Sequence, residues 1–282
     1  MNDYKLPDSA HIGGVRLRVK EMERALQFYR DLLGFTAVRG EDNTVTLSDG
    51  QSPPIITLAE HPDAIPKPRR TTGLYHVAIL TPDRPALGKV FKRLIESGYP
   101  FDGASDHVVS EALYLPDPDG NGLEIYRDRP RETWVLIQDQ VQMDTKPLNV
   151  RSLLDDADSS AWTGIPAGTI IGHVHLHVSN LARAEAFYAD LLGFDVMQRT
   201  YPGALFMAAG GYHHHLGTNT WAGAAPPPAR SVGLDWFDLV VPGAADDLMR
   251  RIHAAGLPIG MDDSEAVLVH DHDGNYVRIV GE

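Results

Sequence analysis

The sequence predicts an α+β fold built from four strand–helix–strand–strand–strand (βαβββ) modules. The main observation is an internal repeat, because VRLRVKEMERALQFYRDLLGF at 15–35 recurs without a gap as VHLHVSNLARAEAFYADLLGF at 174–194. A second repeat relates TGLYHVAILTPDRPALGKVFKRLIESGYP at 72–100 to VGLDWFDLVVPGAADDLMRRIHAAGLP at 232–258. Self-similarity of this length is typical of repeated supersecondary units. We name the four modules A, B, A′ and B′ in chain order.

Modules A and A′ each begin with an alternating segment that predicts a strand, followed by an amphipathic helix. Apolar residues at helical spacing mark the helix of module A: Ala25, Leu26, Phe28, Tyr29, Leu32 and Leu33. Gly34 then supplies the C-terminal stop of this helix. Apolar or alternating segments separated by turns, such as those at 40–43 and 209–211, predict the three strands that complete each module.

Modules B and B′ share the same order of elements and end in a related hairpin. SEALYLPDPDGNGLEIY at 110–126 aligns with SEAVLVHDHDGNYVRIV at 264–280, and an Asp-Gly-Asn turn joins the strands in both. Asp-Gly pairs are common in such hairpin turns. A less repetitive stretch separates the two halves. We therefore expect an N-terminal domain at 1–130, a linker at 131–167 and a C-terminal domain at 168–282, each domain holding two modules.

Composition excludes several classes of function. The chain has 282 residues, no cysteine and a net charge of −13, with no basic run longer than Arg69–Arg70. Such a balance argues against a nucleic acid or an anionic membrane as partner. Any metal must be held by His, Asp or Glu. No apolar run approaches the roughly 20 residues of a membrane span, and the N-terminus lacks a signal-peptide pattern, so we expect a cytoplasmic protein.

One strand of module A′ carries three histidines on a single face. His173, His175 and His177 alternate with apolar residues that must cover the helix, so the histidine face is expected to line the concave side of the sheet. The matching positions in module A are Gly14 and two arginines. Modules A and A′ therefore differ at the residue types that could bind a metal.

Modules B and B′ differ in the same way. His76 opens a strand of module B, and Trp236 takes its place in module B′. Glu124 lies between two apolar residues in the last strand of module B, where a carboxylate is costly unless it is paired or bound to a metal. Arg278 occupies that position in module B′. Modules B and A′ thus hold the candidate ligands, and modules A and B′ form a degenerate counterpart.

A single metal site at His76, Glu124 and His173 is the simplest interpretation of this pattern. Two imidazoles and one carboxylate suit divalent Fe, Mn, Ni or Zn and leave positions open for chemistry. Each residue alone has a structural alternative, because a histidine at a strand start is more often hydrogen-bonded than ligating, and Glu124 could reach solvent beside its turn. Their occurrence in register, and their absence from the sister modules, favours the metal site.

The block HVHLHVSNLARAEAFYADLLGF and the four-module pattern resemble the vicinal oxygen chelate superfamily, which includes glyoxalases, bleomycin-resistance proteins and extradiol dioxygenases. Within it the sequence is most similar to type I extradiol dioxygenases of the catechol 2,3-dioxygenase kind. The resemblance implies two open β-barrels of paired modules, and Fe(II), with Mn(II) as the alternative, held by His76, Glu124 and His173. Because the ligands come from different halves, module B should pair with A′, and A with B′, or else the site forms across subunits of a homo-oligomer.

The resemblance also implies three catalytic residues around the metal. Tyr114 lies ten residues before Glu124, as the family's tyrosine does, and His107 is placed as the histidine that precedes this strand. The family's acid–base histidine lies within a His-His pair that YHHHLG at 212–217 resembles. In an extended strand, side chains alternate, so we expect His214 to face the metal and its two histidine neighbours to face away.

The function implied is oxygen-dependent cleavage of a catechol-type aromatic ring beside its vicinal diol. His214 would take and return a proton, while Tyr114 and His107 would hydrogen-bond the bound substrate. The expected partners are therefore a small aromatic diol and O2. Two alternatives remain: a metal-dependent isomerase or lyase of the glyoxalase I kind, which would usually place a second carboxylate at His214, and a protein that sequesters a small planar molecule and needs no ligand set.

Overall fold

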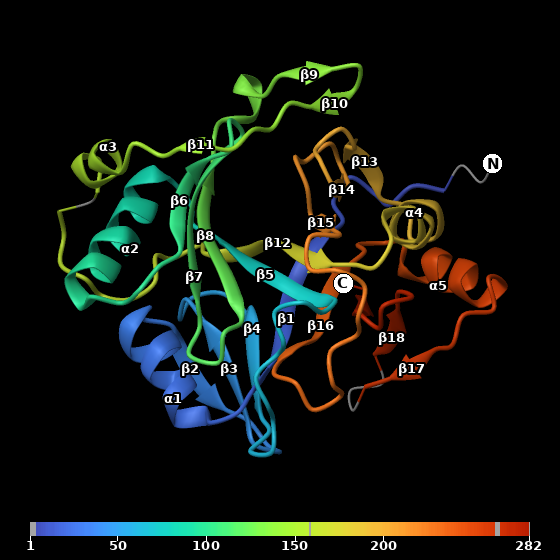
Figure 1. Ribbon diagram of the computed structural model, residues 1–282, viewed down its shortest axis with the longest axis horizontal. Helices are drawn as coiled ribbons and strands as arrows, with labels where there is room; N and C mark the ends of the chain where they lie inside the picture. Colours follow the sequence, from blue (N-terminus) through green and yellow to red (C-terminus); the bar gives the residue numbers. More distant parts are fainter. Residues whose placement is uncertain (1–3, 158, 263–265, 282) are drawn as a thin grey trace.

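An eight-stranded sheet combines modules A and B′ in the computed structural model, which describes residues 4–157, 159–262 and 266–281 (Figure 1). Its strands, in spatial order, are β17 (Gly260–Met261), β18 (Val267–His270), β19 (Tyr276–Val280), β16 (Gly233–Val240), β1 (His11–Val19), β4 (Ile56–Glu60), β3 (Thr44–Ser48) and β2 (Thr36–Arg39). β1 and β16 pair antiparallel and join the two modules. Residues 264–265, the start of the hairpin motif of module B′, lie outside the described residues.

A nine-stranded sheet combines modules B and A′. In spatial order its strands are β11 (Lys146–Pro147), β6 (Gly103–Asp106), β7 (Ser110–Pro116), β8 (Gly122–Asp128), β5 (Gly73–Leu80), β12 (Ile170–His177), β15 (Leu216–Asn219), β14 (Ala204–Ala208) and β13 (Asp195–Gln198). β5 and β12 pair antiparallel at the junction of the two modules. The α+β fold of four modules is therefore confirmed, as is the pairing of B with A′ and of A with B′ within one chain.

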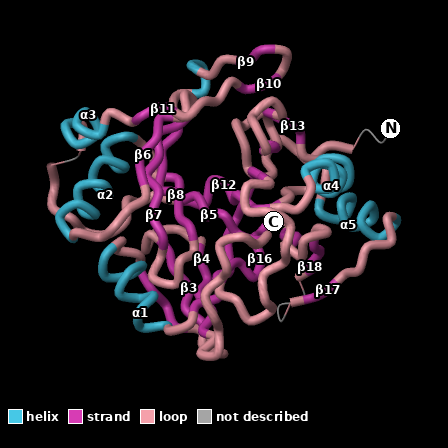
Figure 2. Tube along the Cα trace, in the orientation of Figure 1, coloured by secondary structure: helices cyan, strands magenta, loops and turns pink. Residues whose placement is uncertain are grey.

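Helices cover the outer faces of the curled sheets, as the cyan segments of Figure 2 show. The helices of the four modules are α1 (Met22–Leu26) with η1 (Gln27–Leu32), α2 (Arg84–Ser97), α4 (Leu181–Glu185) with η3 (Ala186–Leu191), and α5 (Ala245–Ala254). Both copies of the Phe-Tyr-x-Asp-Leu-Leu motif are π-helical rather than regular α-helix. Leu33 N–H donates to Phe28 O at 2.9 Å, and Leu192 N–H to Phe187 O at 3.0 Å, which are bonds across five residues.

The repeated tyrosine of this motif ties the two sheets together. Tyr29 of module A is buried and donates a hydrogen bond to Asp117 Oδ2 in the Asp-Gly-Asn hairpin of module B, at 3.1 Å. Tyr188 of module A′ makes the same bond to Asp271 of module B′, at 3.0 Å. Because the partners belong to different sheets, each sequence half is held together by this contact while the sheets pair modules across the halves.

The linker is more structured than its irregular sequence predicts. It contains η2 (Arg131–Thr133), β9 (Leu136–Ile137), β10 (Gln140–Val141), β11 and α3 (Val150–Asp155). β9 and β10 form a separate hairpin, and β11 extends the nine-stranded sheet beyond β6. The linker thus runs along the rim of the sheet that carries the candidate metal ligands. Within the described ranges, none of the helices has the length and apolar character needed to cross a membrane.

Candidate metal centre

The three predicted metal ligands come together because of the strand register. His173 on β12 and Glu124 on β8 both lie opposite Ala78, the residue of β5 between them. His76 is two residues earlier on β5, so its side chain projects from the same face of the sheet. The possible ligand atoms of the three residues all lie within 4.8 Å of one another, and all three residues are buried. Ala78 between them is small and leaves the concave face open.

The contacts within this cluster suit a cation better than a simple hydrogen-bonded triad. His76 Nε2 is 2.9 Å from Glu124 Oε2, yet this buried nitrogen has no aligned hydrogen bond among the described residues. His173 Nε2 lies 3.3 Å from the same oxygen. Two imidazole nitrogens and a carboxylate oxygen thus converge on one small volume. Such a donor set fits a divalent transition metal with open coordination positions.

The protonation of the cluster also suits metal binding. Burial alone would raise the pKa of Glu124, but the neighbouring His173 and His76 outweigh this and hold its pKa well below its usual range. Burial lowers the pKa of His173 to about 4, against a smaller opposite effect of Glu124. At neutral pH the site therefore offers a carboxylate and a neutral imidazole, which are the forms that bind a metal.

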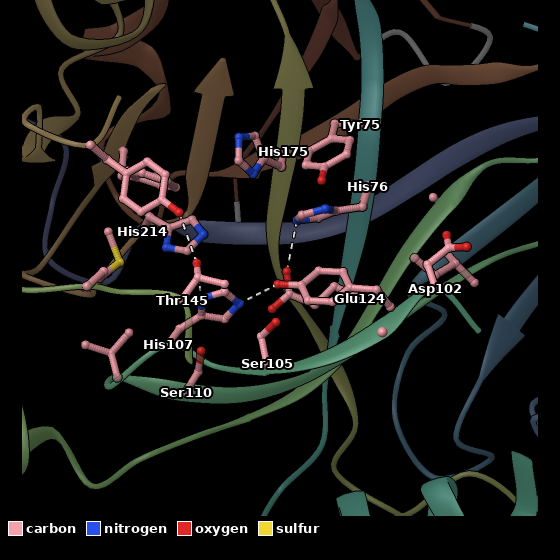
Figure 3. A pocket seen from close by; sticks show the side chains of 18 of the residues that line it. Tyr75, His76, Asp102, Ser105, His107, Ser110, Glu124, Thr145, His175 and His214 are labelled. Atoms are coloured by element: carbon pink, nitrogen blue, oxygen red, sulfur yellow. Dashed lines mark hydrogen bonds and ion pairs between the residues drawn. The ribbon is translucent and has the colours of Figure 1, made fainter. Parts of the chain in front are cut away.

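A cavity of about 450 Å³ opens beside this cluster (Figure 3). His76 and Glu124 line it, and so do all three residues expected to act in catalysis, Tyr114, His107 and His214. The aromatic side chains of Tyr75, Tyr201, Phe206 and Trp221 form much of the remaining wall. The structure therefore brings five of the six predicted site residues to one concavity, from three strands and two loops, while His173 on β12 lies behind them against Glu124 and His214.

Tyr114 and His107 form one unit in the cavity wall. Tyr114 lies directly opposite Glu124 in the β7–β8 ladder, and its hydroxyl is 2.6 Å from His107 Nε2. The other ring nitrogen of His107 lies 2.9 Å from the carbonyl oxygen of Asp144, on the linker. Burial, followed by the charge of Glu124, raises the pKa of Tyr114 well above its usual value. Tyr114 therefore remains a protonated phenol that can donate a hydrogen bond.

Of the three consecutive histidines, His214 lines the cavity, whereas the expectation that His213 faces away is wrong. Residues 212–215 form an irregular turn before β15 rather than a strand, so strict alternation of side chains does not apply. His214 lines the cavity, and its ring centroid is 4.1 Å from that of His173. His213 does not face away, because it is fully buried with its Nδ1 2.8 Å from His214 Nδ1. His215 is also buried, and accepts a hydrogen bond from Ala209 N–H.

A chain of hydrogen bonds that the sequence did not reveal supports His214 from behind. Asp128 Oδ1 lies 2.8 Å from His213 Nε2, and its Oδ2 accepts a bond from the Tyr212 hydroxyl at 2.8 Å. Tyr126 OH lies 2.8 Å from the same hydroxyl. The available signal was the alternation of polar Glu124, Tyr126 and Asp128 along one face of β8.

His175 and His177 lie on the same strand as His173 but have local partners. Asn219 Nδ2 is 3.0 Å from His175 Nε2, and Asn219 Oδ1 is 2.7 Å from His177 Nδ1. Gly217 faces the His175 ring, and a Cβ at this position would approach the ring within 3.0 Å. His175 lines the cavity beside His76. His175 is therefore a wall residue of the cavity, and each of the two histidines has one ring nitrogen bonded to Asn219.

The positions expected to be degenerate are filled by a different set of contacts. Arg278 Nε and Nη2 bond the two carboxylate oxygens of Asp238 at 2.7 and 2.8 Å. The guanidinium groups of Arg16 and Arg278 lie 4.7 and 5.6 Å from the ring centroid of Trp236. Within the described residues, the only cluster of potential metal ligands is the one at His76, Glu124 and His173.

Comparison with known proteins identifies one family for both halves of the chain. The family model of the Glyoxalase/Bleomycin resistance protein/Dioxygenase superfamily matches residues 10–125 and 170–279. Catechol-2,3-dioxygenase of Bacillus subtilis (strain 168) is 44% identical over 281 residues, which cover 97% of this chain and 98% of the relative.

Two solved structures share the fold at low sequence identity. One is a protein of Bacillus subtilis subsp. subtilis str. 168 that is described as a dioxygenase by inference. It has a TM-score of 0.68 at 15% identity, and the match covers 99% of this chain and 86% of that chain. Glyoxalase I from Zea mays has a TM-score of 0.57 at 16% identity, covering 97% of this chain and 92% of that chain. The family resemblance read from the sequence is confirmed. The chain belongs to the glyoxalase/bleomycin resistance protein/dioxygenase superfamily, as a homologue of catechol-2,3-dioxygenase.

Proposed function

We propose that the protein is a metal-dependent extradiol dioxygenase that cleaves a catechol-type aromatic vicinal diol with O2. The observation that carries the proposal is the convergence of His76, Glu124 and His173 within 4.8 Å, on a cavity that also presents His214. The relative with 44% identity over nearly the whole chain is a catechol-2,3-dioxygenase, which supports the same reaction class.

The three ligands would hold Fe(II), with Mn(II) as the alternative. A bound divalent metal supplies Lewis acidity and a template for the substrate diol and O2. Two imidazoles and one carboxylate occupy one face of such an ion and leave the remaining positions free. The protein ligands approach from the strand side, so the free positions would face the cavity.

His214 is proposed to accept a proton from the substrate diol and later to return one. A carboxylate can only accept hydrogen bonds, so the bond to Asp128 places a proton on His213 Nε2. A neutral His213 then has a lone pair on Nδ1, which accepts the Nδ1 proton of His214. This leaves an unprotonated Nε2 on His214, as a general base requires. Burial, reinforced by the surrounding imidazoles, lowers the pKa of His214 well below its usual value and favours the neutral form.

Tyr114 and His107 are proposed to bind and orient the reacting ring. The Asp144 carbonyl can only accept a hydrogen bond, so a neutral His107 carries its proton on Nδ1, and its Nε2 accepts the Tyr114 hydroxyl proton at 2.6 Å. The Tyr114 oxygen then keeps lone pairs that can accept a hydrogen bond from a hydroxyl of the substrate. Because Tyr114 lies opposite Glu124 in the sheet, a diol bound at the metal centre would be within its reach. His107 in turn is held by the linker carbonyl of Asp144.

The alternatives fit the site less well. A glyoxalase-like centre would need a further carboxylate near His214, and Glu124 is the one carboxylate in the described ligand cluster. A sequestering protein does not need Glu124 buried between two histidines, because a buried carboxylate is costly unless it is paired or bound to a metal. The fold shared with glyoxalase I from Zea mays is common to all three activities.

The test is metal analysis of anaerobically purified protein, followed by an assay of catechol cleavage. Wild-type protein loaded with Fe(II) should convert catechol to a coloured ring-opened product. His214→Ala should retain the metal and lose on the order of 10² to 10⁴ in turnover, the range for an acid–base group. Loss of the metal from His214→Ala would instead make His214 a ligand and favour the glyoxalase-like reaction. Turnover that is unaffected in His214→Ala would contradict the proposal.

A further inference from the structure

The cavity beside the candidate metal centre has a one-sided charge. Asp102, Glu124 and Asp144 contribute carboxylates to its wall, whereas no lysine or arginine of the described chain lines it. Glu124 faces the two candidate histidine ligands, so its charge would be used in holding a metal. The two aspartates therefore set the electrostatic character of the remaining space. The whole chain adds to this effect with its net charge of −13.

The two aspartates differ in how far their charge is offset. Asp144 Oδ2 lies 3.8 Å from Lys146 Nζ, and Asp144 Oδ1 accepts a bond from Thr145 N–H. Asp102 is exposed, and it forms no ion pair within the part of the chain that the structure describes. In Figure 3, Asp102 lies beyond His76 and Glu124, on the side of the pocket away from His214. Among the described residues, Asp102 is thus the aspartate of the cavity wall whose charge has no ion-pair partner.

Aromatic faces lie near the same opening. Tyr75 and Trp221 line the cavity yet are partly exposed, and their rings meet edge to face with centroids 5.8 Å apart. Burial raises the pKa of Tyr75, and the charges of Glu124 and Asp102 raise it further, in keeping with their proximity. A carboxylate beside exposed aromatic faces attracts a cation and accepts an uncharged group, but repels an anion.

The cavity is also larger than the ring it is expected to hold. Its volume is about 450 Å³, within the usual range of about 300–1,000 Å³ for small-molecule sites. An unsubstituted catechol would leave much of this space to water. Besides the candidate ligands, the wall includes Asp102, Tyr75 and Trp221, which a substituent on the ring can contact.

We infer that the enzyme selects catechols by the charge of their ring substituent, with Asp102 as the specificity-determining residue. Catechols with an uncharged or cationic side chain are substrates, and those with a carboxylate side chain are rejected. This inference rests on the proposed dioxygenase function, because it concerns the same cavity. Its physical basis is the repulsion between the substrate anion and Asp102, at a site without a compensating lysine or arginine.

The test compares three ligands of similar size: 3,4-dihydroxyphenylacetate, its uncharged amide, and dopamine. With Fe(II)-loaded wild-type enzyme, kcat/KM for the amide should exceed that for the carboxylate by about tenfold or more, and dopamine should equal or exceed the amide. Asp102→Asn should reduce the amide-to-carboxylate ratio about three- to tenfold. Asp102→Lys should reduce it further. The ratio of the wild-type enzyme should also fall at high salt, which screens exposed charges.

Asp63→Asn is the matched control, because Asp63 is an exposed aspartate outside the cavity wall. This variant should keep the wild-type ratio. An amide-to-carboxylate ratio near one in the wild type, or the same ratio in wild type and both Asp102 variants, would overturn the inference. Anaerobic calorimetric binding of the three ligands provides a readout independent of turnover. If no catechol is cleaved but binding follows the expected order, the proposed reaction fails and the charge selection stands.

Discussion

The two sheets of this protein are built from the same kind of module, but the residues on their concave faces differ. In the nine-stranded sheet, His76, Glu124 and His173 converge beside a cavity. In the eight-stranded sheet, the corresponding Trp236 and Arg278 pack against one another, and Arg278 forms a bidentate pair with Asp238. The guanidinium thus provides within the chain the positive charge that a bound metal would provide in the other sheet.

The difference can be traced to a few positions on equivalent strands. Ala78 lies beside Glu124 in one sheet, and Asp238 lies beside Arg278 in the other. The negative Glu124 thus has an uncharged neighbour, whereas the positive Arg278 has a negative one. A buried charge is tolerated only when it is compensated. One concave face is therefore complete without a ligand, whereas the other has converging donors that a cation would complete.

The largest effect is expected from removing a candidate ligand. His76→Ala, Glu124→Ala and His173→Ala should each abolish retention of the metal, and with it catechol cleavage, because two donors are too few for stable binding. Metal analysis of the purified variants, with wild-type protein holding close to one Fe(II) or Mn(II) per chain, measures this. Two metals per chain would mean that the second concave face also binds a cation, and would remove the contrast between the sheets.

A smaller effect is expected from Asp128→Asn, which changes the support of His214. The amide can turn its NH2 group toward His213 Nε2, which would then have to accept a hydrogen bond. The proton of His213 would move to Nδ1, and that of His214 would move to Nε2. His214 could then no longer use Nε2 as a base, because this atom must be unprotonated to accept a proton. Turnover should fall on the order of 10²-fold with the metal retained.

Tyr212→Phe is the control for Asp128→Asn, because it removes a hydrogen bond to Asp128 and leaves the carboxylate in place. Its turnover should stay within about tenfold of wild type. If metal-loaded Asp128→Asn is as active as wild type, the chain of hydrogen bonds behind His214 has only a structural role. The candidate metal ligands alone would then account for the functional difference between the two sheets.

The repeats predicted most of this architecture, because a module that recurs in register reveals both its elements and its exceptions. Comparing His76 with Trp236, and Glu124 with Arg278, identified which concave face retained metal-binding residue types. That comparison needed only strand periodicity and the shift between copies. The pairing of B with A′ was one of two expected arrangements, the other being a site across subunits, and the order of the strands supports the first.

Other features could not be read from the sequence because they depend on contacts between distant segments. The orientation of His213 follows from an irregular turn and from Asp128, which is 85 residues away in the chain. The strand β11 forms because the linker pairs with β6, and its short sequence gives no periodic signal. The π-helical turns use residues that also fit a regular helix, and only the hydrogen bonds distinguish the two.

The two sheets should also differ in how much they contribute to the pH dependence of stability. Burial lowers the pKa of His173 to about 4 and that of His215 to about 3, below the 6.5 of an exposed histidine. Unfolding exposes both rings, so the unfolded chain binds protons that the folded chain does not. The free energy of unfolding of the metal-free protein should therefore be highest above pH 6.5 and fall by a few kcal/mol, as an order of magnitude, towards pH 4.

Urea unfolding at pH 7 and pH 5 measures this loss. His215→Gln should weaken the pH dependence, because it removes one of the buried imidazoles of the nine-stranded sheet. His270→Gln, on β18 of the eight-stranded sheet, should leave it unchanged, since His270 is only partly buried. An equal change in both variants would mean that the loss of stability is not specific to the sheet with the candidate metal centre.

The smallest effect on chemistry is expected in the eight-stranded sheet itself. Arg278→Lys cannot reproduce the bidentate pair with Asp238, because an ammonium group lacks the planar fork of a guanidinium. Trp236→Phe reduces the ring surface on which Arg16 and Arg278 lie. Each change should lower the free energy of unfolding by about 1–3 kcal/mol, the range for hydrogen bonds to charged groups and packed aromatic rings.

Turnover per bound metal should nevertheless stay within a few-fold of wild type in both variants, because the contacts they change lie in the sheet without candidate ligands. Chemical denaturation and steady-state kinetics on the same metal-quantified preparations separate the two effects. A loss of roughly a hundredfold in turnover, the size expected for an acid–base group, would place the reaction in the eight-stranded sheet. The guanidinium of Arg278 would then belong to a working site, and the assignment of the two concave faces would be reversed.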